Sequence, residues 1–217
     1  MRRYLEGVCV LKTVRMRFEK VGCARFISHL DLMRVMIRAI RRAGLPIWYT
    51  EGFNRHPYIA FGAPLSLGYE GLRECLELRL LEDTLSSEEA AARLNAVLPE
   101  GLRIVEAFEA RQKVRELTSA RYRLTLGANI DMVQALLAAP VIEVEKRSKK
   151  RGVRRVDIRP ALAEAEVAGA ASGSVMEVVL ACNGEEAVNP ALIQQALGCE
   201  MRVLRLWLED SAGNEWG

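Results

Sequence analysis

The sequence contains few of the residues and motifs on which most enzymes depend. It has only two histidines, and its five cysteines form no Cys-x-x-Cys pair. Without such pairs there is no recognisable site for zinc or for an iron–sulfur cluster. A glycine-rich phosphate loop, a Gly-x-Ser-x-Gly turn and a His-Glu-x-x-His motif are also missing. These absences argue against nucleotide hydrolysis, serine hydrolases and zinc proteases, and we expect no metal and no cofactor.

Long apolar runs are missing as well. No stretch approaches the roughly 18 apolar residues that a membrane-spanning helix needs. The N-terminal Met-Arg-Arg-Tyr-Leu-Glu begins no apolar segment of the kind found in signal peptides. An odd number of scattered cysteines is typical of a reducing compartment. We therefore predict a cytoplasmic protein that does not associate with membranes.

The composition is that of a folded protein. Half of the 217 residues are hydrophobic and the mean hydropathy is +0.03, so the chain can bury a core. A chain of this length corresponds to one large domain or to two domains of about 100 residues.

Charge is distributed unevenly, although the formal net charge is only +3. Residues 12–42 contain nine basic and two acidic side chains, and seven of the ten residues 146–155 are Lys or Arg. The segments 74–109 and 161–217 are acidic, with nine acidic side chains each. A solvated surface would explain any one run, but two basic blocks favour a polyanionic partner.

Residue periodicity predicts the same order of elements in both halves of the chain. Alternating apolar and polar residues predict strands, and apolar residues at helical spacing predict helices. In the first half, the order strand, helix, strand, strand, helix, strand corresponds to residues 14–20, 29–43, 47–50, 74–81, 88–98 and 102–108. Residues 26–27 could extend the first strand. In the second half, strands and helices are predicted at 121–126, 131–139, 141–146, 153–158, 175–182, 190–197 and 202–208, and the segment 161–167 fits the order least well.

This repeated order predicts an α+β protein made of two tandem ferredoxin-like (βαββαβ) sandwiches, each an antiparallel sheet backed by two helices. The first domain would span residues 1–110 and the second residues 120–217. The polar segment 111–119 would link them.

The first predicted helix separates apolar from basic residues. Ser28 followed by Asp31 is typical of a helix start, and Gly44 followed by Pro46 is typical of a helix end. The apolar residues at helical spacing predict a buried stripe of Leu30, Met33, Met36, Ile37 and Ile40. The opposite face would carry Arg34, Arg38, Arg41 and Arg42.

His29 lies in the first turn of this helix. Backbone N–H groups at a helix start bind anions, so His29 could contact a phosphate beside the preceding Arg25. An ordinary pKa near neutrality would also suit a general acid or base. The alternative is a structural residue whose ring hydrogen-bonds a loop carbonyl.

A second candidate site is the loop 52–57, which Gly, Asn and Pro shape. Aromatic, guanidinium and imidazole side chains stack on bases and hold phosphates, and the loop brings these types together in Phe53, Asn54, Arg55 and His56. The alternative is a turn whose Phe53 fills the core and whose Arg55 is solvated.

A third candidate is a basic loop between two predicted strands. Clustered like charges repel each other, which a polyanionic partner would relieve. The residues are Lys146, Arg147, Lys149, Lys150 and Arg151 in the loop, with Arg154 and Arg155 following. A solvated, disordered loop is the alternative.

Several motifs in order resemble a bacterial family called radical SAM-linked, or radical SAM-associated, proteins, a domain of unknown function. The matching segments are 26–34 (FISHLDLMR), 38–46 (RAIRRAGLP), 51–57 (EGFNRHP), 64–68 (PLSLG) and 156–160 (VDIRP). One difference is Arg55, where that family usually has proline. In the family the domain stands alone or follows a radical SAM enzyme, which implies such an enzyme as partner and an accessory role.

Three hypotheses follow. The protein could be a non-catalytic RNA-binding module that presents tRNA or rRNA to a radical SAM enzyme. It could itself process or modify RNA with His29 or His56 as the catalytic residue. It could instead be an adaptor that docks to a radical SAM enzyme through its acidic segments. The first requires that the basic segments, which are distant in the sequence, converge into one continuous groove when the chain folds.

Overall fold

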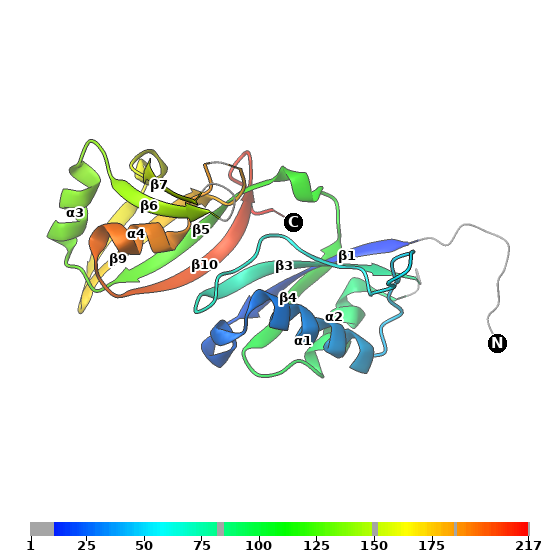
Figure 1. The fold of residues 1–217 in the computed structure, drawn as a ribbon. Helices are drawn as coiled ribbons and strands as arrows, with labels where there is room; N and C mark the ends of the chain where they lie inside the picture. Colours follow the sequence, from blue (N-terminus) through cyan, green and yellow to red (C-terminus); the bar gives the residue numbers. More distant parts are fainter. Residues whose placement is uncertain (1–10, 82–84, 149–151, 185, 217) are drawn as a thin grey trace, which may run out of the picture.

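The computed structural model of the protein describes residues 11–81, 85–148, 152–184 and 186–216. Within these ranges the chain forms four α-helices and ten strands (Figure 1). The helices are α1 (His29–Arg42), α2 (Ser87–Asn95), α3 (Ile130–Ala138) and α4 (Pro190–Leu197). The strands are β1 (Lys12–Lys20), β2 (Ile59–Phe61), β3 (Glu70–Leu80), β4 (Leu102–Glu109), β5 (Leu117–Leu126), β6 (Glu143–Ser148), β7 (Gly152–Asp157), β8 (Glu166–Ala170), β9 (Gly173–Ala181) and β10 (Met201–Asp210). The predicted α+β class is confirmed.

Eight of the described strands form one mixed sheet. Its order is β4-β1-β3-β10-β5-β9-β8, with β2 paired to β3. Neighbours within each half of the chain are antiparallel. The two halves meet where β10 runs parallel to β3, with Leu204 opposite Glu70 and Arg205 opposite Gly71. The sheet is therefore continuous through both halves, which the sequence pattern did not indicate.

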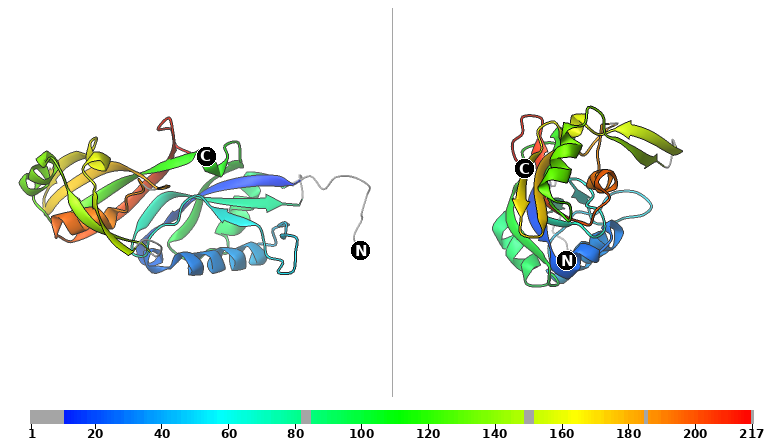
Figure 2. Two further views of the ribbon diagram at one scale, coloured as in Figure 1. Left: turned by 45° about the horizontal axis from the view of Figure 1, so that its top comes forward. Right: turned by 90° about the vertical axis from the view of Figure 1, so that its left-hand side faces the viewer.

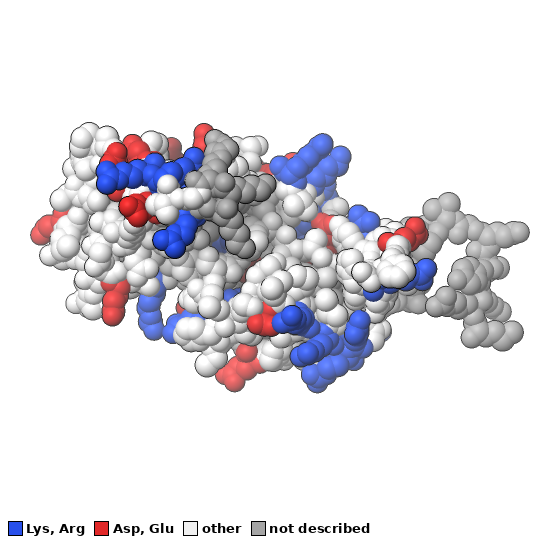
Figure 3. Space-filling model, viewed as in Figure 1, with Lys and Arg blue, Asp and Glu red and all other residues white. Residues whose placement is uncertain are grey.

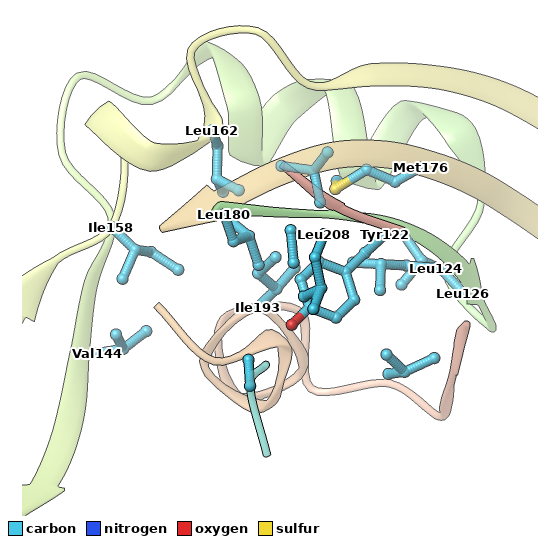
Figure 4. Close-up of a cluster of buried hydrophobic side chains, with 14 of the residues drawn as sticks. Tyr122, Leu124, Leu126, Val144, Ile158, Leu162, Met176, Leu180, Ile193 and Leu208 are labelled. Carbon is cyan, nitrogen blue, oxygen red and sulfur yellow. The ribbon is translucent and has the colours of Figure 1, made fainter. Parts of the chain in front are cut away.

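Two apolar clusters cover this sheet, one for each half. The cluster of the first half joins β1, β3 and β4 to α1 and α2, and includes Met16, Met36, Leu78 and Leu94. The cluster of the second half joins β5, β9 and β10 to α3 and α4. In Figure 4, Ile193 of α4 points toward Leu180 and Tyr122 of the strands. The division into domains at residues 110 and 120 stays a prediction.

Helix α1 begins as the sequence predicts. The Ser28 hydroxyl accepts a hydrogen bond from the Asp31 N–H (3.2 Å) and donates one to Asp31 Oδ2 (2.7 Å), and this bond lowers the pKa of Asp31. Gly44 ends the helix with a φ of +62°, which favours glycine. The buried face matches the prediction in part, since Met36 and Ile40 are buried together with Leu32 and Ala39. The predicted Met33 and Ile37 are only half-buried. Leu30 is 61% exposed, because its position lies around the helix from Leu32.

Some predicted strands are wrong. Residues 26–27 do not extend β1, because the chain turns through a short 3-10 helix, Gly22–Phe26. Residues 47–50 form only isolated bridges, from Ile47 to Leu80 and from Tyr49 to Pro57. The segment 161–167, which fits the predicted order least well, contains the end of a 3-10 helix and the start of β8. The strands β6 and β7 form a separate hairpin that Figure 2 (right) shows projecting from the body of the molecule.

Buried charges hold the two halves together. Arg205 of β10 pairs with the carboxylate of Glu74 on β3, and its Nε lies 2.7 Å from Glu74 Oε1. Burial alone lowers the pKa of Arg205, but the Glu74 carboxylate raises it above its ordinary value. Lys20 is buried nearby and donates to the Arg25 carbonyl (3.1 Å). None of the described helices is long and apolar enough to cross a membrane.

Candidate nucleic-acid interface

The arginines of α1 form an exposed basic row. Arg34 pairs with Asp31 (2.8 Å), while Arg38, Arg41 and Arg42 are exposed and have no carboxylate partner among the described residues. By contrast, carboxylates neutralise the sheet arginines Arg15, Arg17, Arg73, Arg121, Arg123 and Arg205. The α1 arginines are therefore available to an external anion.

A shallow recess runs beside this row. It has a volume of about 370 Å³ and lies between α1 and the segment that follows α2. Arg38 and Arg42 line it from α1, and Val97, Leu98 and Pro99 line it from the other side. The recess thus combines two guanidinium groups with apolar surface.

His29 lies at the start of α1 but is held by packing. Its ring is half-buried and meets the ring of Phe61 edge to face, with centroids 5.2 Å apart. Arg25 is also partly buried, and its guanidinium lies 4.7 Å from the centre of the Phe26 ring and 4.0 Å from Glu70. This geometry favours a structural role for His29.

The loop 51–56 projects its side chains into solvent. The Phe53 side chain is fully exposed, at 104%, so the interpretation that it fills the core is wrong. Asn54, Arg55 and His56 are exposed as well. His56 Nδ1 lies 3.2 Å from Thr50 Oγ1, and the Thr50 N–H donates to the His56 carbonyl (2.9 Å). These contacts close the loop and fix its base.

The two histidines do not form a catalytic pair. His29 begins α1, whereas the loop with His56 follows the C-terminal end of that helix (Figure 2, left). No group of three or more His, Cys, Asp or Glu side chains in the described ranges is placed to hold a metal ion.

The basic hairpin is only partly described. Lys146 donates to the Ala187 carbonyl (2.6 Å), and Arg155 lies 3.8 Å from Glu143. Arg147 and Arg155 are exposed, and Arg154 is half-buried. The predicted site residues Lys149, Lys150 and Arg151 lie outside the described residues.

Both basic segments are visible from one side of the molecule. Figure 3 shows Lys and Arg atoms over the β6–β7 hairpin and over α1 on the same face. The described surface between them is mostly uncharged. The two segments therefore face the same way without forming one continuous basic surface in this view.

Sequence reasoning missed an exposed apolar patch beside the start of α1. Phe26, Leu30 and Leu67 are 63%, 61% and 62% exposed. The Gly68 N–H donates to the Arg25 carbonyl (2.9 Å), which brings the segment with Leu67 next to Phe26. Periodicity predicted Leu30 in the buried stripe of the helix and Phe26 in a strand. The structure instead places Leu30 off the buried face of α1 and Phe26 at the end of the turn Gly22–Phe26.

The thiols give a direct check on the described fold. Cys23 is exposed, whereas Cys75 is buried, and burial raises the pKa of Cys75 to about 12. At pH 8 we expect iodoacetamide to alkylate Cys23 readily and Cys75 only after denaturation. Peptide mass spectrometry would measure both sites, and equal rates in the native protein would contradict the buried position of Cys75.

In comparison with protein families, residues 13–190 match a family described as uncharacterized protein conserved in bacteria (DUF2344). The chain belongs to the DUF2344 family. Comparison with curated proteins finds no match. Among solved structures, the chain is similar to a crystal structure of an unknown protein from Galdieria sulphuraria, with 10% identity and a TM-score of 0.30. That similarity covers 90% of this chain and 99% of the other.

Proposed function

We propose that this DUF2344 protein binds RNA through the face that carries α1, the loop 51–56 and the β6–β7 hairpin. The observation that carries the proposal is the row of exposed α1 arginines without described carboxylate partners. Like charges three and four residues apart repel each other on a helix. The helix dipole stabilises Arg41 and Arg42, because both lie in the last turn of α1. Arg38 precedes that turn, so the dipole does not offset its repulsion from the other arginines. Phosphate groups would offset this repulsion, since guanidinium groups bind them well.

We further propose that the RNA is tRNA or rRNA and that the protein presents it to a radical SAM enzyme. The resemblance of five ordered motifs to radical SAM-linked proteins supports this partner. Purification of the tagged protein from its own cells, with and without nuclease, tests it. Co-purification that survives nuclease would favour direct contact with the enzyme, and loss of the enzyme after nuclease would favour contact through RNA.

A catalytic role for His29 or His56 has less support. The ring of His29 packs against Phe61, and His56 hydrogen-bonds within its own loop. Turnover of pooled cellular RNA that is lost in His29→Ala or His56→Ala would favour an enzyme over a binding module.

Removal of the α1 arginines is expected to weaken the salt dependence of RNA binding. Each phosphate contact on a single strand contributes about 0.7 to the slope of log affinity against log salt concentration. Arg38→Gln, Arg41→Gln and Arg42→Gln together should therefore lower the magnitude of that slope by about 2. Fluorescence anisotropy with labelled RNA over a salt series would measure it.

A matched control removes the same charge elsewhere. Arg103, Arg111 and Arg115 are exposed and lie outside α1, the loop 51–56 and the hairpin. The triple glutamine variant at these positions should keep the slope of the unchanged protein. If both triple variants lower the slope equally, only net charge matters and the proposed face is wrong. Affinity that does not depend on salt would contradict RNA binding through phosphates.

We also propose that each half of the chain is a ferredoxin-like unit. In the first half the fourth, first, third and second strands lie in the order β4-β1-β3-β2. In the second half the corresponding order is β10-β5-β9-β8, with the β6–β7 hairpin inserted after α3. The same strand order and the same alternation with helices support an internal repeat.

A further inference from the structure

We infer that the RNA lies along α1 as an unpaired strand, with bases stacked on the rings of Phe26 and Phe53. This inference rests on the function proposed above and specifies the form of RNA that the same face accepts. It also assigns a binding role to Phe26, which precedes the row of arginines on α1.

One stacking position lies before the N-terminal end of α1. The Phe26 ring is 63% exposed, and the Arg25 guanidinium lies 4.7 Å from the ring centre. The guanidinium lies over one face of the ring, so a base would stack on the part of the ring that stays exposed. Leu30 and Leu67 extend the apolar surface next to it.

A basic track continues from this patch along the helix. Leu30, Arg34, Arg38 and Arg41 follow one another at spacings of four, four and three residues, so they lie along one side of α1. The 14 residues of α1 span about 21 Å. A backbone that follows this side would meet Arg34, Arg38 and Arg41 in turn, with Arg42 beside the last of them.

The second stacking position follows the C-terminal end of α1. The Phe53 side chain is fully exposed, so its ring contributes nothing to the core. The loop that carries it is closed at its base by the Thr50–His56 hydrogen bonds, and Arg55 lies two residues away. An aromatic ring held in solvent, in a loop that also carries a cation, suits an unpaired base.

The two exposed rings argue for single-stranded rather than double-stranded RNA. In a duplex the base faces are stacked on each other, so proteins recognise it through its phosphates, its 2′-hydroxyls and its shape. Protruding phenylalanines add nothing to such contacts. A row of arginines with a ring at each end therefore fits an unpaired strand.

Fluorescence anisotropy tests the inference with a labelled single-stranded RNA and with the same RNA annealed to its complement. We expect the single strand to bind about tenfold more tightly. Phe26→Ala and Phe53→Ala should each weaken single-strand binding about 5- to 10-fold. The salt slope should stay unchanged, because neither substitution removes a charge.

Met132→Ala is the matched control, since Met132 is an exposed apolar side chain (51%) on α3, outside α1, the loop 51–56 and the β6–β7 hairpin, and has no ring. It should change affinity less than about twofold, because only a ring provides base stacking. The inference would be overturned if binding depended on salt but was equally tight for the two RNAs, or if neither phenylalanine variant weakened it. Either result would leave the proposed function standing. Failure of both RNAs to bind in a salt-dependent way would overturn the proposed function itself.

Discussion

Glu74→Ala is expected to cost at least about 3–5 kcal/mol of the free energy of unfolding. Glu74 is 4% exposed and is the carboxylate partner of Arg205, which is 1% exposed. It also raises the pKa of the buried Lys20, which burial and Arg205 lower. Its removal would leave two buried cations without their anion, and uncompensated buried charge is among the most destabilising changes in a protein.

Comparison among variants separates this effect from ordinary loss of a contact. Urea unfolding of Arg205→Ala should show a smaller loss than Glu74→Ala, because Lys20 still faces Glu74. Arg123→Ala breaks an ion pair whose side chains are 49% and 33% exposed, and should cost less than about 1 kcal/mol. The triple variant Lys20→Met, Glu74→Met and Arg205→Met should recover most of the stability, since it removes all three charges. Equal urea midpoints for Glu74→Ala and Arg123→Ala would show that Glu74 does not neutralise the buried cations Lys20 and Arg205.

Trp216→Ala is expected to cost about 3–5 kcal/mol, the usual effect of removing a buried tryptophan. Trp216 is 1% exposed, and its ring lies 3.9 Å from the Arg15 guanidinium. Its indole N–H donates to the Lys113 carbonyl (3.3 Å), and its backbone N–H donates to the Leu208 carbonyl (2.8 Å). The C-terminal segment is thereby fixed to β1, to the linking segment and to β10.

The packing around this ring leaves little space. A Cβ added at Gly62 would lie 3.1 Å from the Trp216 ring and 2.9 Å from Leu208. Trp216→Phe keeps most of the ring and should lose less stability than Trp216→Ala in the same urea experiment. A Trp216→Ala protein with the wild-type midpoint would mean that the C-terminal segment does not hold the two halves together.

Local signals in the sequence predicted the helices well. Ser28 and Asp31 start α1 as expected, and α4 occupies the predicted residues 190–197. Capping depends on contacts between residues two or three positions apart, so the local sequence determines it. The same locality explains the correct placement of most strands of the main sheet.

The candidate site was predicted only in part. The exposed arginines Arg38, Arg41 and Arg42 were found because helical spacing separates them from the buried face. The exposure of Phe26 was missed, because the 3-10 turn at Gly22–Phe26 changes the direction of the chain just before α1. Periodicity does not report such a turn.

The sequence by itself determined the α+β class, the capping of α1 and the uneven distribution of charge, because each depends on neighbouring residues or on composition. Only the tertiary structure decided the parallel contact of β3 with β10 and the burial of Lys20, Glu74 and Arg205. Alternation along a strand shows that its two faces differ but not what covers each face. The strands β1, β3 and β10 therefore carry charges that look solvent-exposed in the sequence and lie in the interior of the fold.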